Sequence, residues 1–211
     1  EAVANAVIHR DYRLGSGSVN IEHSPEVMTI SSPGPLVTGV TPENILTHPS
    51  KPRNPCLATA ARQLGLAEEV GRGVARMYRE MIRTGREVPG IDSSQDGVRV
   101  ALVGGAPNTQ MARYVAVLPE RERDDTDAML ILFTLRKRRT ISASTAAPVL
   151  QKTEDESEAV LTRLASNDVG MIEPTRETAR RSRPTYRLRA EALQTLGAAV
   201  ALMVVFLLIE S

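Results

Sequence analysis

The pattern of apolar and polar positions predicts a mixed α/β chain. At the N-terminus Glu1, Asn5 and His9 recur every four residues, so they share one face of a helix whose other faces are small or apolar. Residues 19–23 and 27–30 alternate between apolar and polar side chains, which predicts a half-buried β-hairpin. The first domain therefore begins with a helix followed by two paired strands.

A proline-rich segment follows the hairpin. Prolines in residues 35–56 disfavour regular structure there, except for one short helix predicted over residues 41–46. An irregular segment between a strand and a glycine-rich helix start is a usual place for a nucleotide lid, with Lys51, Arg53 and Asn54 as candidate phosphate contacts. A plain surface loop is the alternative. Further elements are predicted as helices over residues 57–64 and 73–84 and a strand over residues 97–103.

The second half of the chain predicts three helices and then a hairpin. Residues 124–126 cap the first helix, and the third begins with a capping box at Thr153 and Glu156. Helix, helix, helix, hairpin is the order of a winged helix-turn-helix, a DNA-binding domain. The predicted organisation is a domain over residues 1–105, a linker over 106–122, a winged helix over 123–190 and an apolar tail over 191–211.

The tail contains an apolar run at residues 196–209. As a helix this run is about 21 Å long, shorter than a hydrocarbon core of about 30 Å. A buried terminal helix, an oligomer contact and a tail anchor remain open, and burial or homo-oligomerisation is favoured. Membrane association is therefore not expected.

Composition narrows the picture only slightly. The net charge of +1 gives no overall attraction to nucleic acid, although basic residues gather in the second half. The single Cys56 excludes a disulfide framework and indicates a cytoplasmic protein, and three scattered histidines predict no structural zinc site. Since the chain starts at Glu1 rather than Met, we expect it to begin within a longer protein.

Two stretches carry candidate chemistry. On the N-terminal helix, Asn5 offers a neutral oxygen to Mg²⁺ and Glu1 is a candidate base, although a stripe facing solvent would look the same. Gly71 and Gly73 flank Arg72 at a predicted helix start, where exposed N–H groups bind anions; a glycine hinge between packed helices is the alternative. Both stretches are compatible with a metal–phosphate ligand.

The order of several motifs resembles one family. Residues 1–12, Glu-x-x-x-Asn-Ala-x-x-His-Arg-Asp-Tyr, resemble the N-box of the GHKL-type ATPase domain in RecG-like, "ATP-dependent DNA helicase-related" transcriptional regulators. Further motifs of that family follow in the same order at residues 30–34, 39–44, 53–55 and 64–73, before a closing strand at 98–103. The resemblance covers roughly the first half of the chain, and winged helices also end such regulators.

The resemblance implies a partial GHKL-type α/β sandwich that binds ATP with Mg²⁺. It makes Glu1 the general base and Asn5 the Mg²⁺ ligand, while the family's adenine-binding Asp is replaced by Ser31 or Ser32, which puts adenine selectivity in doubt. Gly34 would form the adenine-side loop. The remaining residues expected at the cofactor are His9, Arg10, Ser32, Gly71, Arg72 and Gly73.

The predicted wing is basic, which favours DNA contact over a protein contact or an inert wing. The third helix opens with acidic residues that a phosphate backbone would repel. The candidate DNA-binding residues are Arg176, Arg180, Arg181, Arg183 and Arg187.

The sequence thus predicts an ATP-binding, DNA-binding transcriptional regulator whose usual N-terminal Schlafen/AlbA-type domain is absent from the chain. Two alternatives remain: a catalytically inactive GHKL-fold scaffold for protein interaction, and a weak Mg²⁺-dependent ATP hydrolase coupled to a DNA transaction. A P-loop helicase is excluded because the sequence contains no Gly-x-x-x-x-Gly-Lys-Ser/Thr motif.

Overall fold

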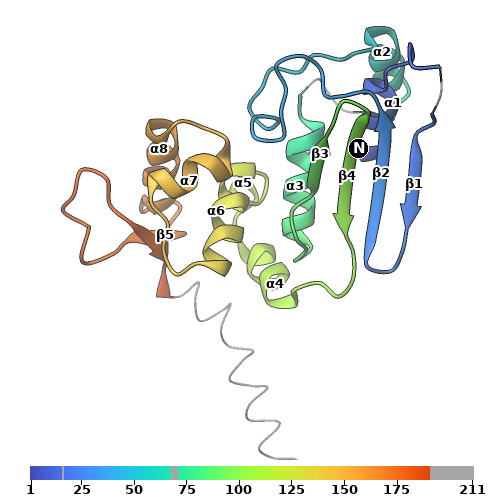
Figure 1. Cartoon of the computed structure of the whole chain (residues 1–211). Coiled ribbons are helices and arrows are strands. Elements are labelled where there is room, and N and C mark those ends of the chain that lie inside the picture. The colour runs from blue at the N-terminus through green and yellow to red at the C-terminus, as the bar shows by residue number, and fades with distance from the viewer. Residues whose placement is uncertain (16, 68–70, 191–211) are drawn as a thin grey trace, which may run out of the picture. The chain divides into compact units, whose positions relative to one another are not determined.

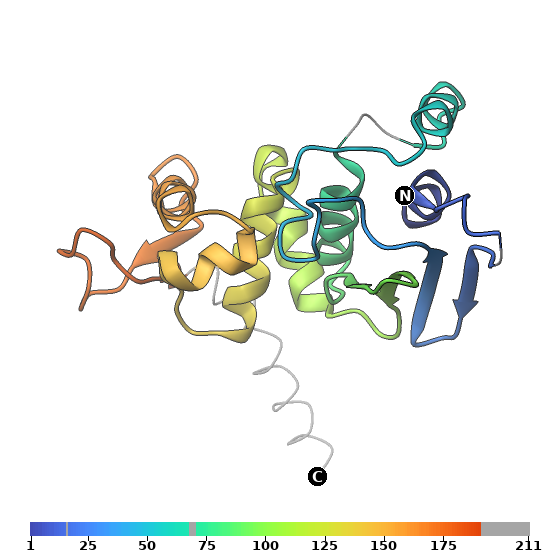
Figure 2. The same ribbon diagram turned by 45° about the horizontal axis from the view of Figure 1, so that its top comes forward.

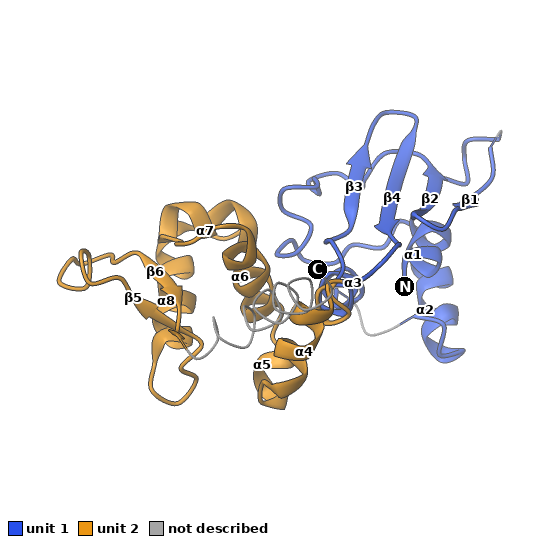
Figure 3. Ribbon diagram, turned by 90° about the horizontal axis from the view of Figure 1, so that it is seen from below, with its two compact units in different colours: residues 1–81, 86–107 blue, residues 82–85, 108–211 orange. Residues whose placement is uncertain are grey.

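The computed structural model describes residues 1–15, 17–67 and 71–190, which divide into two compact units (Figure 3). Unit 1 comprises Glu1–Met81 and Arg86–Pro107, and unit 2 comprises Ile82–Gly85 and the described chain from Asn108. Two helices, α4 (Thr109–Val117) and α5 (Glu120–Arg123), occupy most of the segment predicted as a linker. Residues 106–122 are therefore largely helical.

Unit 1 is built on an antiparallel sheet with the strand order β1-β2-β4-β3 (Figure 1). The predicted hairpin and closing strand are confirmed, whereas β3 was missed although Asp96-Gly97 marks its turn into β4. The strands are β1 (Asn20–His23), β2 (Val27–Pro33), β3 (Gly90–Ser93) and β4 (Gly97–Val103).

Two helices cover one face of this sheet, α1 (Ala2–His9) and α3 (Gly73–Arg83), as Figures 1 and 2 show. The small side chains of Ala2 and Ala6 allow α1 to approach Ile30 of β2, and Met77 of α3 completes the buried cluster. Helix α2 (Pro55–Gln63) contacts α1 and has proline at its first position. The mixed α/β class is confirmed.

The helix predicted over residues 41–46 is wrong, because this segment forms turns. The Asn44 side chain accepts a hydrogen bond from the Thr41 N–H at 2.8 Å and donates one to the Gly39 carbonyl at 2.9 Å. Asparagine competes with helices by bonding nearby backbone in this way.

Unit 2 continues with three helices and a two-stranded sheet, as the pattern predicted. Asp125 caps α6, and Thr153 and Glu156 form the expected capping box of α8. An isolated bridge joins Ile141 to Tyr186. The elements are α6 (Thr126–Lys137), α7 (Ala143–Leu150), α8 (Glu154–Ala165), β5 (Ile172–Pro174) and β6 (Tyr186–Leu188).

Ion pairs link the start of α6 to α8 and to the turn between α7 and α8: Asp125 pairs with Arg163 and Asp127 with Lys152. The predicted tail, residues 191–211, lies outside the described residues, and so do Glu68 and Glu69 beside the glycine motif. No helix within the described ranges is long and apolar enough to cross a membrane.

Candidate functional site

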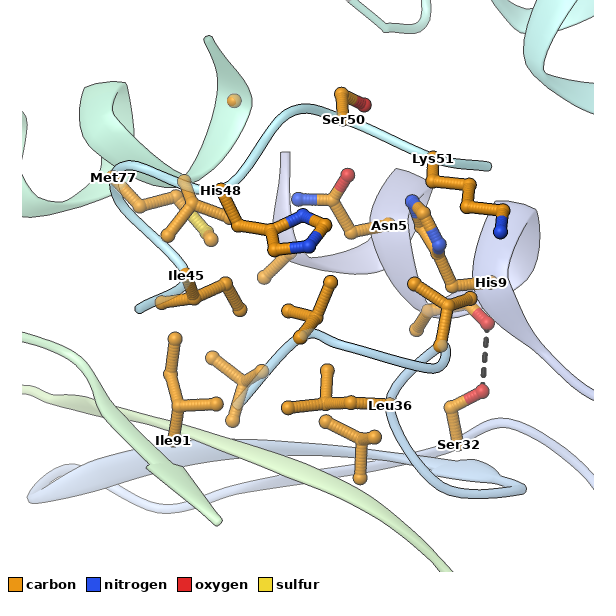
Figure 4. Close-up of a pocket in the computed structure, with 18 of the residues that line it drawn as sticks. Asn5, His9, Ser32, Leu36, Ile45, His48, Ser50, Lys51, Met77 and Ile91 are labelled. Atoms are coloured by element: carbon orange, nitrogen blue, oxygen red, sulfur yellow. Dashed lines mark hydrogen bonds between the residues drawn. The ribbon is translucent and has the colours of Figure 1, made fainter. Parts of the chain in front are cut away.

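A cavity of about 150 Å³ lies inside unit 1 (Figure 4). It is enclosed by α1, strands β2, β3 and β4, the segment that follows β2, and the start of α3. Most of its wall is apolar, and a smaller set of polar side chains faces the same space. The polar side chains are Asn5, His9, Ser32, His48, Ser50 and Lys51. Few polar groups in an apolar wall are typical of a small-molecule site.

A second cavity, of about 50 Å³, adjoins the first. The two share part of their walls, and the second adds Glu1 and Arg62 to its own lining. The shared residues are Asn5, His9, Ser50, Gly71 and Gly73. A ligand with an apolar part and a polar part could therefore extend from the larger cavity into the smaller one past Asn5.

Asn5 is a polar side chain of the cavity wall that has a buried atom without a hydrogen-bond partner. Its Nδ2 atom is buried and has no hydrogen-bond partner, although the side chain lines both cavities. In Figure 4 the amide points into the larger cavity near His48 and Ser50. A buried amide without a partner costs about 1–3 kcal/mol, so we expect a ligand at this position to supply the missing interaction.

Gly73, the first residue of α3, lies directly against the α1 face. A Cβ atom built at this position would lie 2.6 Å from Glu1 Oε2 and 3.5 Å from Asn5 Nδ2. Glu1 Oε1 also lies 4.0 Å from Arg76 Nη1 on α3. The missing side chain therefore leaves room for Glu1 and Asn5 beside a helix N-terminus, where backbone N–H groups attract anions.

Ser32 and His9 also line the larger cavity. Ser32 Oγ donates a hydrogen bond to the Ala6 carbonyl at 2.7 Å, so this hydroxyl can only accept from a ligand. Burial, and secondarily the charge of Arg53, lowers the pKa of His9. The ring is therefore mainly neutral near pH 7 and can both donate and accept.

His48 and Ser50 belong to the site but carried no sequence signal, because they lie in an irregular segment with no periodicity. Lys51, which the sequence marked, lies beside His9 in Figure 4. His48 Nδ1 lies 2.7 Å from the Pro49 carbonyl, which only accepts, so Nδ1 carries the proton.

Three predicted cofactor residues lie outside the lining of both cavities. Arg10 stacks over Tyr12 at 4.5 Å and donates to the Gly17 carbonyl. Gly34 packs against Asp11, where a Cβ atom would lie 2.5 Å from the Asp11 Cβ. Arg72 is exposed between the two glycines. The structure therefore does not place these residues at the site, whereas Glu1, Asn5, His9, Ser32, Gly71 and Gly73 come together.

Arg53 and Asn54, which the sequence offered to phosphates, instead hold the end of α1. Asn54 Nδ2 donates to the Ile8 and Arg10 carbonyls, both at 2.8 Å. Arg53 donates to the His9 carbonyl at 3.0 Å and to the Asp11 carboxylate at 3.1 Å. These bonds satisfy carbonyls that the end of a helix leaves without partners.

Asp11 is the anionic centre of this clamp. The Arg13 guanidinium and backbone N–H donate to its carboxylate, and together with Arg53 they hold the pKa of Asp11 far below its usual range. Its charge is therefore already compensated by the fold.

The described residues contain no cluster of three or more His, Cys, Asp or Glu side chains that could hold a metal ion by themselves. A cation at this site would need oxygens from its ligand in addition to Asn5 and Glu1. Mg²⁺ accepts such sites, because it is often held by one or two side chains together with substrate phosphates. The unpartnered Asn5 Nδ2 atom is a donor and fits a phosphate oxygen, whereas the Oδ1 atom of the same amide is the one that would face Mg²⁺. Together with the space beside Gly73, this donor set fits a Mg²⁺–nucleotide complex.

In unit 2, the five predicted DNA-binding arginines fall into two groups. Arg183 donates to Glu154 at 2.9 Å and to Asp155, and Arg187 donates to Glu173 at 2.9 Å. The other three are exposed, and none forms an ion pair with a residue that the structure describes. They are Arg176, Arg180 and Arg181.

Comparison with known families finds a match within unit 1. Residues 16–102 match the family described as "Putative ATP-dependent DNA helicase recG C-terminal". The matched range contains β1, β2, β3 and β4 up to Leu102, residues 34–54 that follow β2, and helices α2 and α3, while α1 precedes it. This part of the chain is similar to an ATPase-like domain of the RecG C-terminal type.

Among solved structures, the chain is similar to the DIP2311 protein from Corynebacterium diphtheriae. The sequences are 27% identical, the TM-score is 0.77, and the match covers 92% of this chain and 41% of that one. The chain thus spans about two fifths of the length of this neighbour. None of the curated proteins matches the chain.

Proposed function

We propose that unit 1 binds ATP as its Mg²⁺ complex and that the chain acts as an ATP-binding, DNA-binding transcriptional regulator. The observation that carries the nucleotide site is the buried Asn5 Nδ2 without a partner, next to Glu1, Gly71 and Gly73. The match to an ATPase-like family supports the choice of ATP.

The two cavities divide the proposed ligand into two parts. The larger one offers apolar walls for a base, and the Ser32 hydroxyl can accept from an exocyclic amino group, which adenine carries. The smaller one offers Glu1, Asn5 and the glycine N–H groups to phosphates and a cation. Bound Mg²⁺ would neutralise phosphate charge there.

The test is calorimetric titration of Mg-ATP into the chain and into Asn5→Ala. The matched control is Asn20→Ala, because Asn20 lies on exposed strand β1 and its amide donates to Glu22. We expect binding that Asn5→Ala removes and Asn20→Ala retains. Absence of binding by the folded chain, or equal binding by Asn5→Ala, would overturn the proposal.

Two outcomes separate an enzyme from a scaffold. If Glu1 is a general base, Glu1→Gln removes ATP hydrolysis while retaining ATP binding. If unit 1 is an inactive scaffold, neither the wild-type chain nor Glu1→Gln hydrolyses ATP, whether or not ATP binds. Arg76, 4.0 Å from Glu1, is close enough to help hold the carboxylate.

DNA binding by unit 2 is the second part of the proposal. The order of α6, the Ile141 bridge, α7, α8 and the β5–β6 hairpin supports a winged helix, and three exposed arginines lie on the hairpin loop. Binding to duplex DNA that weakens steeply with salt would support it, and no binding at low salt would overturn it.

A further inference from the structure

The hairpin loop of unit 2, residues 175–185, folds back onto the start of α8. Arg183 Nη1 lies 2.9 Å from Glu154 Oε2, and the other terminal nitrogen of Arg183 contacts Asp155. In helix-turn-helix proteins the N-terminal residues of the second helix of the motif reach base edges in the major groove. In this chain that part of α8 is acidic and already occupied by the loop.

Exchange of partners would not make the start of α8 attractive to DNA. The pairs are solvent-exposed and therefore weak, so a phosphate could compete for Arg183. That exchange would leave the Glu154 and Asp155 carboxylates uncompensated beside the phosphate backbone. A contact between Arg183 and DNA would therefore add little to the binding affinity, and the same reasoning applies to Arg187, which pairs with Glu173.

Hydrogen bonds at the base of the loop hold the segment that carries the other arginines. Thr178 is 9% exposed, and its Oγ1 accepts from the Thr185 N–H at 2.8 Å and lies 2.7 Å from Thr175 Oγ1. The Thr175 N–H also donates to the Thr185 carbonyl at 2.7 Å. These bonds fix both ends of the segment that carries the unpaired arginines.

We propose that the chain binds duplex DNA through the phosphate backbone, using Arg176, Arg180 and Arg181, while Arg183 holds the start of α8 away from the base edges. This inference rests on the proposed DNA binding and adds that unit 2 does not read base sequence. Glu177 lies in the same loop, so residues 176–181, which carry the three exposed arginines, have a net charge of +2 rather than +3. Phosphate contacts position a protein on DNA but carry no sequence information.

The experiment measures fluorescence anisotropy of the full chain with a labelled duplex of about 20 base pairs between about 50 and 200 mM salt. Three phosphate contacts give a slope of log K against log salt of about −2.7, a loss of about 40-fold over that range. Arg176→Ala, Arg180→Ala and Arg181→Ala should each reduce the slope by about 0.9. Arg183→Ala and Arg187→Ala are the matched controls and should leave the slope unchanged.

Sequence dependence gives the second readout. Duplexes of unrelated sequence should bind within about threefold of one another, whereas specific binders prefer their site by at least about 10³-fold. The double change Glu154→Gln with Asp155→Asn should raise the affinity for all duplexes by a similar factor. A strongly preferred sequence, or a slope lowered by Arg183→Ala as much as by Arg180→Ala, would overturn the inference while leaving DNA binding intact. No binding at about 50 mM salt would overturn both.

Discussion

The two ends of α1 treat polar side chains in opposite ways. At the C-terminal end Asn54 and Arg53 donate to backbone carbonyls, and Asp11 is compensated by two arginines. On the preceding turns the Asn5 amide is buried without a partner, beside a glycine that leaves room for Glu1. Polar groups that stabilise a fold make their hydrogen bonds within the protein, whereas groups that bind a ligand make theirs only when the ligand is present.

The contrast is tested most strongly at Gly34. We expect Gly34→Ala to lower the free energy of unfolding by about 2–5 kcal/mol, because the backbone φ is +93° and the new Cβ atom would lie 2.5 Å from the Asp11 Cβ. Urea denaturation measures the change. A loss below about 1 kcal/mol would show that the C-terminal end of α1 is not tightly constrained.

The next effect concerns the carbonyls at the end of the helix. Asn54→Ala removes two hydrogen bonds at 2.8 Å, so we expect a loss of about 2 kcal/mol in stability. Asn20→Ala, which removes an amide that donates to Glu22 on exposed strand β1, is the comparison variant. Equal losses in both variants would remove the special role of Asn54.

Gly73→Ala should separate binding from stability. Gly73 is the first residue of α3, and its new Cβ atom would meet the flexible end of Glu1 at 2.6 Å and Asn5 Nδ2 at 3.5 Å, an ordinary contact distance, so stability should change by less than about 1 kcal/mol. Displacement of the Glu1 carboxylate should weaken Mg-ATP binding at least about tenfold, measured by calorimetry. Gly15→Ala is the control, since no atom lies within 4 Å of its Cβ position. Unchanged affinity would place the ligand elsewhere.

The smallest expected effect is the pH dependence contributed by His9. Its folded-state pKa is lowered, so the unfolded chain binds more protons, and this stability is present above about pH 6.5 and lost as the pH falls below it. His9→Asn should flatten the fall in melting temperature between about pH 7 and 5.5. His23→Asn, on exposed strand β1, should keep the wild-type profile. An identical profile for His9→Asn would contradict the assignment.

Prediction from the sequence succeeded where a local pattern has one physical meaning. The alternation of the first hairpin, the caps at Asp125 and Thr153, and the four-residue spacing of Glu1, Asn5 and His9 each set a structure that neighbouring residues alone specify. The local pattern that predicted a helix over residues 41–46 failed, because the Asn44 side chain forms hydrogen bonds with the backbone of its own turn.

The sequence by itself determined the mixed α/β character, the helical face that carries Asn5, and the basic character of the unit 2 hairpin. Only the tertiary structure decided which polar groups remain for a ligand, since hydrogen bonds between segments far apart in the chain committed Arg53 and Asn54 to α1. Likewise, an ion pair spanning 29 residues joins Arg183, one of the predicted DNA-binding residues, to Glu154. Such pairings depend on chain reversals that no short pattern encodes.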